Sequence, residues 1–221
     1  MTGLNAGSNS IQPGRMLIRF RTVLPQDYTT FRYVIVFNTS GNGQEPFPQA
    51  FQTGFLNFSF AFVVGGPAGA LAQPQLLQYF LAPGTSSGIQ TFNIVVPIQL
   101  AQVVPNTGGS QFGEFTLSFD RTLLFGVNPG GTPVPLPSAT GGNPNVQPTT
   151  LAQHVWNINF ITTDASGTPI DSAGIGGNVD NTFQQQIDTT QFIDQTFTKP
   201  QTAQVTSGAA QIRGYEIINA P

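Results

Sequence analysis

Apolar residues recur along this chain at the spacings of β-strands. The run 31–37 is apolar on both alternating faces apart from Arg32, and it combines β-branched with aromatic residues. A strand with one wet face alternates between apolar and polar residues, whereas a strand covered on both faces does not. The sequence therefore predicts that 31–37 is a strand in the middle of a sheet, packed on both sides.

Strict alternation is clearest in 56–64, where Phe58, Phe60 and Phe62 share one face and small or polar residues share the other. Phenylalanine buries a large apolar area, so a plain core strand is the main interpretation. The alternative is that this uncharged run is partly exposed and pairs with another chain.

Similar patterns predict further strands, separated by turns rich in Gly, Pro, Asn and Ser. They lie at 16–24, 76–81, 91–104, from 115 toward 125, and at 155–163, 192–197 and 209–219. Pro97 interrupts 91–104, so this stretch is expected to be an edge or bulged strand, or two short strands. Residues 171–188 are expected to be irregular. Helical spacing never persists for more than about two turns.

These patterns predict an all-β protein. We expect an antiparallel β-sandwich of jelly-roll or Ig-like type, with about eight to ten strands and long Gly/Pro loops. Residues 1–14 are polar and end in Pro-Gly, so they are expected to form a flexible N-terminal arm. Residues 15–221 show no shift in composition and are expected to be one domain, with a long surface loop at 126–149.

The composition narrows the class of protein. Hydrophobic residues make up 39% and aromatic residues 11%, so the chain can bury a core. Charged residues make up only 8%, against about 25% in ordinary soluble domains. The net charge of −3 means that the chain has no excess of basic residues to contact phosphates, so nucleic-acid binding is not expected. No run is long enough to predict a membrane span, and the first residues do not resemble a signal peptide.

The counts of cysteine and lysine exclude cysteine chemistry and favour a location outside the cell. The chain has no cysteine, which excludes disulfides, thiolate chemistry and cysteine zinc sites. Lys199 is the only lysine, and polarity comes from Asn, Gln, Thr and Ser. This composition favours an extracellular or cell-surface location. The arginines near the N-terminus are expected to lie on solvated sheet faces or in ion pairs; they are Arg15, Arg19, Arg21 and Arg32.

No catalytic residue is predicted. His154, the only histidine, stands beside Trp156 in a predicted strand, where a hydrogen-bonded structural role is the main interpretation. Both residues are kept as candidates for ligand binding, with a glycan as the ligand considered. Glu114 and Asp120 lie six residues apart on one predicted strand, roughly 20 Å apart and too far for a glycosidase pair. A catalytic pair of carboxylates from different strands is not excluded by the sequence, so hydrolase activity is kept as an alternative.

Calcium is the one cofactor considered. Oxygen-bearing side chains and a glycine give the segment after 31–37 the outline of a calcium loop; the ligands would be Asn38, Ser40 and Asn42. Gln49 stands where such a loop has glutamate, so an Asn-Gly hairpin turn is the main interpretation. A second candidate set is Asp171, Asn178 and Asp180.

Three functions follow as hypotheses. The first is a non-enzymatic extracellular structural protein, such as a surface-layer or filament subunit, which assembles with copies of itself by strand addition. In composition alone the chain resembles subunits of prokaryotic surface layers and extracellular filaments. The first alternative is a secreted carbohydrate- or surface-binding module that uses Trp156 or the loop 126–149. The second alternative is a hydrolase.

Overall fold

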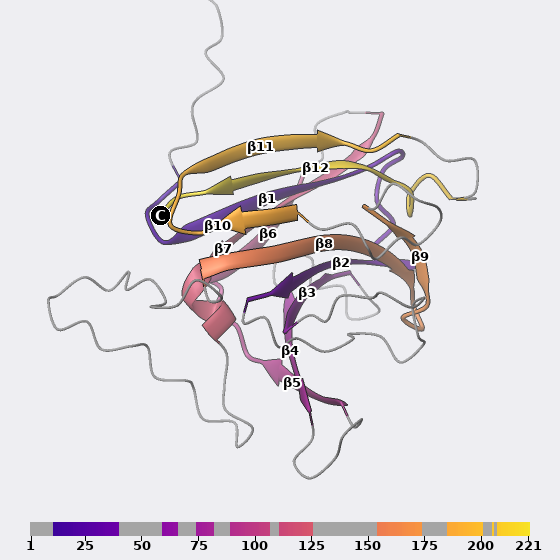
Figure 1. Ribbon diagram of the computed structural model, residues 1–221. Coiled ribbons are helices and arrows are strands. Elements are labelled where there is room, and N and C mark those ends of the chain that lie inside the picture. Colours follow the sequence, from indigo (N-terminus) through magenta and orange to yellow (C-terminus); the bar gives the residue numbers. More distant parts are fainter. Residues whose placement is uncertain are drawn as a thin grey trace, which may run out of the picture.

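The computed structural model shows two layers of antiparallel β-sheet (Figure 1). The residues that it describes are 11–39, 59–65, 74–81, 89–106, 111–125, 154–173, 185–200, 205 and 207–221. The strands are β1 (Arg15–Thr22), β2 (Phe31–Asn38), β3 (Phe60–Val64), β4 (Gln75–Leu81), β5 (Ile89–Ile94), β6 (Ala101–Pro105), β7 (Gly113–Asp120), β8 (Val155–Asp164), β9 (Pro169–Ser172), β10 (Gln185–Asp188), β11 (Ile193–Thr198) and β12 (Ile212–Asn219). A short 3-10 helix, η1 (Arg121–Phe125), follows β7.

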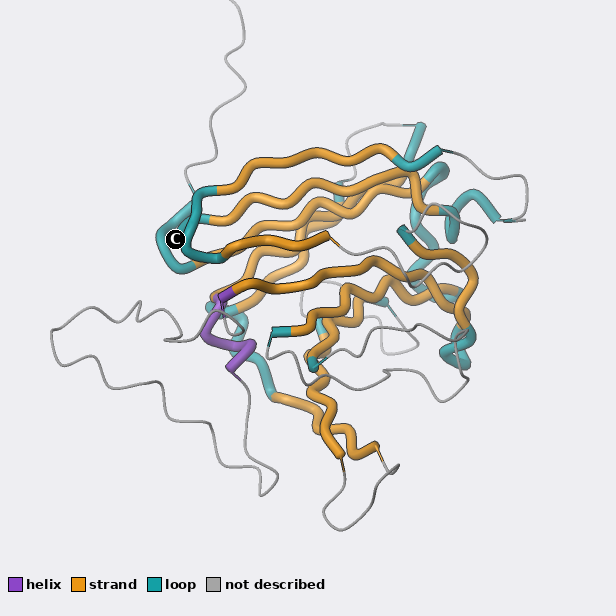
Figure 2. The backbone as a smooth tube through the Cα atoms, viewed as in Figure 1, coloured by secondary structure: helices purple, strands orange, loops and turns teal. Residues whose placement is uncertain are grey.

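The strands form two sheets, which we name sheet A and sheet B (Figure 2). Sheet A has the order β11-β12-β1-β7-β6, and sheet B has the order β10-β8-β2-β3-β4-β5, with β9 paired to β8. The predicted antiparallel sandwich is therefore confirmed. The described residues form twelve strands, more than the eight to ten that the sequence predicted. Of the arm expected at 1–14, residues 1–10 lie outside the described residues, as do the long loop at 126–149 and Phe58. The end of that arm is bonded to the sandwich, because the Gly14 amide donates to the Ala220 carbonyl at 3.0 Å and the Gly14 carbonyl accepts the Arg121 amide at 3.0 Å.

The extra strands come from two regions of the chain. Pro97 separates β5 from β6, and its carbonyl accepts hydrogen bonds from the Leu100 and Ala101 amides at 2.9 and 3.3 Å. The chain thus crosses from sheet B to sheet A here, which confirms the interpretation as two short strands. The prediction that 171–188 is irregular is wrong at both ends, because β9 and β10 each pair with β8.

Strand β2 lies inside sheet B, between β3 and β8, as the sequence predicted. Its inward side chains, which include Ile35 and Phe37, belong to the main core between the sheets. Its outward side chains, Val34 and Val36, are buried in a second cluster on the other face of sheet B. The Asn-Gly turn expected after β2 falls largely on residues 40–58, which lie outside the described residues; the next described strand, β3, begins at Phe60 and pairs antiparallel with β2.

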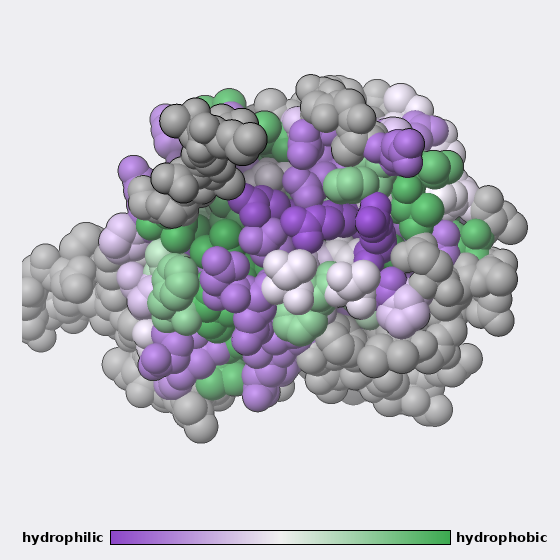
Figure 3. Space-filling view, turned by 90° about the horizontal axis from the view of Figure 1, so that it is seen from above, coloured by the Kyte–Doolittle hydropathy of each residue, from purple (hydrophilic) through white to green (hydrophobic). Residues whose placement is uncertain are grey.

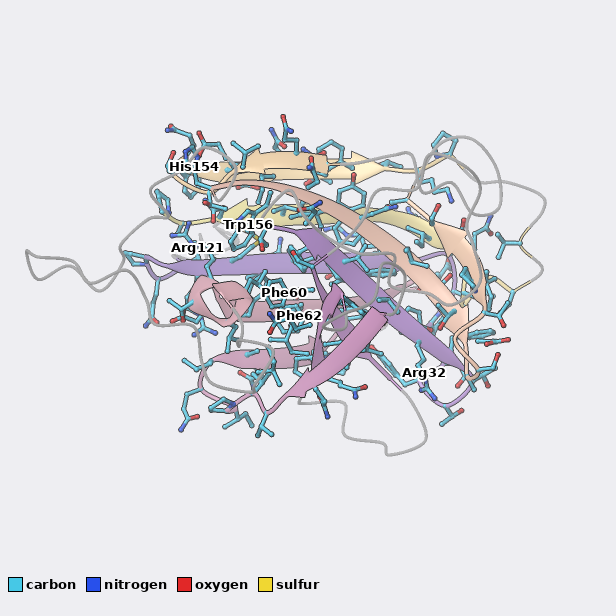
Figure 4. The ribbon with its side chains drawn as sticks, turned by 60° about the horizontal axis from the view of Figure 1, so that its bottom comes forward. Arg32, Phe60, Phe62, Arg121, His154 and Trp156 are labelled. Carbon is cyan, nitrogen blue, oxygen red and sulfur yellow. The ribbon has the colours of Figure 1, made fainter. Side chains whose placement is uncertain are left out.

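Aromatic rings from both sheets fill the main core. Phe62 from sheet B packs on Phe119 from sheet A, with 4.7 Å between ring centroids. Phe160 from sheet B stacks on Tyr215 from sheet A at 3.9 Å. Figure 4 shows Phe60 and Phe62 in the interior of the two layers, and both side chains are buried. The predicted core role of 60–64 is confirmed.

Tight turns at the sandwich ends are held by aspartate side chains. Asp27 Oδ1 accepts hydrogen bonds from the Thr29 amide at 3.0 Å, the Thr29 hydroxyl at 2.6 Å and the Thr30 amide at 3.1 Å. These hydrogen bonds stabilise the carboxylate and lower the pKa of Asp27 to about 2, and the bond from the Thr29 hydroxyl has the largest effect. Similar bonds lower the pKa of Asp164 and Asp188.

We expect the protein to lose stability on acidification through these turns. The folded pKa of Asp27 is depressed, so its contribution is present above its ordinary value of 3.8 and is lost as the pH falls toward about 2. Urea unfolding at neutral pH and in this acidic window measures the loss, and Asp27→Ala is expected to flatten the pH dependence. The matched control is Asp194→Ala on exposed β11. A control that flattens the profile as much as Asp27→Ala contradicts the account.

Candidate functional site

The calcium candidates do not come together in the described chain. Asn38 ends β2 and is buried, while Ser40, Asn42, Asn178 and Asp180 lie outside the described residues. Within the described ranges, no group of three or more His, Asp or Glu side chains could hold a metal ion. Calcium binding therefore stays a prediction that rests on the sequence.

Asp171, the other calcium candidate, is fully buried, and protein donors contact both of its carboxylate oxygens. Oδ1 contacts the Lys199 ammonium and accepts the Ser172 amide at 2.9 Å. Oδ2 accepts the Ile212 amide at 2.8 Å. The Lys199 ammonium also donates to the Ser172 carbonyl. The carboxylate is thus part of a buried ion pair, and sequence reasoning missed the pair because its members lie 28 residues apart.

His154 and Trp156 lie at one end of the sandwich, where β8 begins (Figure 4). The Trp156 ring is buried and packs edge-on against Phe37, with 6.2 Å between centroids. An enclosed ring cannot stack on a sugar, so the structure removes the basis for Trp156 as a glycan platform. His154 Nδ1 lies 3.3 Å from Asp188 Oδ1, at the turn that follows β10.

Arg121, the first residue of η1, lies at the same end and was not predicted from the sequence (Figure 4). Its side chain is buried, and its Nη1 donates to the Thr189 carbonyl. Burial disfavours the charged guanidinium and lowers the pKa of Arg121. Its Nε is buried and has no hydrogen-bond partner among the residues that the structure describes. Asn219 Nδ2 donates to the same Thr189 carbonyl at 3.1 Å. This hydrogen bond connects β12 to the turn after β10.

Two arginines of β1, Arg19 and Arg21, form ion pairs on sheet A, whereas Arg15 donates hydrogen bonds to Ser118 and to the Gln99 carbonyl. Arg21 contacts Glu114 at 2.6 Å and Glu216 at 2.9 Å, and Arg19 contacts Glu216 at 2.8 Å. The view from above in Figure 3 shows hydrophilic side chains gathered across the middle of the molecule. Two carboxylates from different strands do converge here. Each carboxylate is engaged in an ion pair with an arginine guanidinium, Glu114 with Arg21 and Glu216 with both Arg19 and Arg21.

Large apolar side chains are exposed where the chain crosses between the sheets. Val95 is 88% exposed, Ile98 is 54% exposed and Val104 is 52% exposed. We name these three residues the apolar edge. Val95 follows β5, which is at one end of the strand order of sheet B, and Val104 lies in β6, at one end of sheet A. In Figure 1, β4 and β5 extend away from the rest of the two layers.

Comparisons with known proteins supply no relative for this chain. No family model, curated protein or solved structure matches it. Among the helices formed by the described residues, none is long and apolar enough to cross a membrane. The functional argument therefore rests on the chain's own residues.

Proposed function

We propose that this protein is a non-enzymatic structural subunit that assembles with copies of itself, outside the cell or on the cell surface. The observation that carries the proposal is the apolar edge at Val95, Ile98 and Val104, three large hydrophobic residues exposed within ten positions of one another. Exposed apolar side chains that form a contiguous patch are typical of interaction sites, and these three are neighbours along the chain where it passes from β5 into β6.

The position of the apolar edge suggests how copies could meet. In the described part of the chain, β6 pairs only with β7, and β5 pairs only with β4. A strand with one unpaired side presents amides and carbonyls that a second chain can bind. Natural edge strands are often protected by lysine, but β5 and β6 carry no charged residue.

The charge of the whole chain also favours assembly. Only 8% of its residues are charged and the net charge is −3, so repulsion between copies is weak. A contact between two different edges of the same subunit repeats without closing unless its rotation forms a ring, and this geometry builds filaments. The composition, with a single lysine and abundant polar uncharged residues, supports the extracellular location.

The test places charges on the apolar edge. We expect wild-type protein to form species that grow with concentration in light scattering. Val95→Glu/Ile98→Glu should raise the concentration needed for assembly by at least about tenfold, which corresponds to about 1.4 kcal/mol. Both side chains are more than half exposed, so the substitutions should leave the fold intact, as circular dichroism can verify.

The matched control is Leu24→Glu/Phe192→Glu, because both residues are also more than half exposed but lie outside the apolar edge. This variant should assemble like the wild type. Wild-type protein that stays monomeric at high concentration would contradict self-assembly. Assembly that both double variants leave unchanged would contradict the apolar edge as its contact, and deletion of residues 1–14 would then test strand exchange through the N-terminal arm.

A further inference from the structure

The only lysine of the chain lies buried against a buried carboxyl group. The Lys199 side chain is 4% exposed and the Asp171 side chain is not exposed at all. Lysine and aspartate are almost never fully buried unless they are paired. Lys199 follows β11 of sheet A, whereas Asp171 belongs to β9, which is attached to sheet B through β8. The contact therefore joins the two layers of the sandwich.

The surroundings of Asp171 favour its uncharged form. Burial raises the pKa of Asp171, although the Lys199 ammonium and the Ile212 and Ser172 amides act in the opposite direction. Transfer of one proton from Lys199 Nζ to Asp171 Oδ1 removes both charges. The result is a neutral amine in contact with a neutral carboxylic acid, which are the reactants of amide formation.

We propose that Lys199 and Asp171 form an intramolecular isopeptide bond between Nζ and Cγ. The Nζ lone pair attacks Cγ and forms the C–N bond. Oδ2 remains as the carbonyl oxygen, and the Ile212 amide that donates to it at 2.8 Å stabilises the negative charge that develops there. Oδ1 takes a proton from the amine nitrogen, and the Cγ–Oδ1 bond breaks to release one water molecule. The reaction is redox-neutral and needs no other reactant.

The two groups are held in place before the reaction. The Ser172 carbonyl accepts a hydrogen bond from Nζ, and the Ser172 amide donates to Oδ1 at 2.9 Å. The Lys199 amide itself donates to the Arg213 carbonyl at 2.8 Å, which fixes the start of the lysine side chain next to β12. Positioning of two reactants in one site replaces a bimolecular encounter with an intramolecular step. The product would be a covalent link between the sheets.

The direct test is the intact mass of purified, folded full-length protein, with circular dichroism to verify β-structure. We expect the mass to be lower than the sequence mass by one water molecule. Lys199→Arg and Asp171→Ala should each restore the full sequence mass, and Asp194→Ala, on exposed β11, should keep the loss. After denaturation, an amine-reactive reagent should fail to label Lys199 in the wild type.

Peptide mapping locates the bond. Cleavage after Asp188 separates Asp171 from Lys199 in sequence, so the two peptides should stay joined in the wild type and separate in Lys199→Arg. A folded wild type with the full sequence mass and a labelled Lys199 would overturn the proposal and leave a buried ion pair. A loss of water that persists in Lys199→Arg would also overturn it, because dehydration would then not involve this amine. None of these results depends on whether copies of the protein assemble.

Discussion

Truncation of Phe37 to alanine is expected to lower the free energy of unfolding by about 3–5 kcal/mol. The side chain is fully buried, and its ring contacts Phe62 at 6.1 Å, Phe119 at 5.6 Å and Trp156 at 6.2 Å between centroids. These neighbours come from β3, β7 and β8, so a cavity at Phe37 weakens packing within sheet B and between the sheets. Urea unfolding followed by tryptophan fluorescence measures the loss.

Phe192→Ala is the matched control for this prediction, because it removes the same atoms from a side chain that is 65% exposed. Its effect on the free energy of unfolding should be within about 0.5 kcal/mol, as for most surface substitutions. Equal losses for Phe37→Ala and Phe192→Ala would mean that Phe37 is not enclosed between two sheets.

Replacement of Lys199 by methionine is expected to lower the free energy of unfolding by about 3–5 kcal/mol. Methionine fills a similar volume but leaves the Asp171 carboxyl group buried without the lysine nitrogen that contacts it. Removal of one partner of a buried pair is strongly destabilising, whereas removal of both is often tolerated. We therefore expect Lys199→Met/Asp171→Leu to recover part of the loss. Denaturant unfolding of the two variants beside the wild type measures this difference.

Arg19→Met provides the comparison for Lys199→Met at a half-exposed ion pair. The Arg19 side chain is 25% exposed, and its partner Glu216 keeps a second contact with Arg21 at 2.9 Å. A pair of this kind contributes about 1 kcal/mol or less. If Lys199→Met destabilises the protein no more than Arg19→Met, neither a buried ion pair nor a covalent bond at Lys199 contributes to stability.

The parts of the fold that the sequence predicts are those with a local signal. Strand β2 is apolar on both faces and is buried on both faces, and the alternation that includes Phe60 and Phe62 places both in the core. Burial on one face of a strand requires a period of two, and this period can be seen in a few consecutive residues. Pro97 likewise marks the crossing between the sheets through its own backbone chemistry.

Strands β9 and β10 could not be predicted in the same way. Each has four residues, Pro-Ile-Asp-Ser and Gln-Gln-Ile-Asp, and too few of them are apolar to show a period. Both are strands because β8 supplies hydrogen-bond partners. Strand β9 returns along β8 after a short turn, with Thr163 opposite Pro169, whereas β10 pairs with residues that are distant in sequence, such as Asp188 with Val155. A local pattern contains no information on such a partner.

For the candidate site residues too, the sequence predicts what has a local signal and misses what depends on contacts between distant segments. The sequence left solvated faces and ion pairs open for the N-terminal arginines. The ion pairs of Arg19 and Arg21 depend on Glu114 and Glu216, which come from β7 and β12 on either side of β1. The contact between Lys199 and Asp171, and the burial of Arg121, likewise depend on how distant segments pack. Trp156 was kept as a ligand candidate because the sequence alone does not show that its ring is buried against Phe37 of β2.

Electron microscopy of purified wild-type protein over a range of concentrations tests the proposed function most directly. The account predicts filaments or sheets whose amount rises with concentration and which are lost in Val95→Glu/Ile98→Glu. Monomeric particles alone, at every concentration and for every variant, would contradict it.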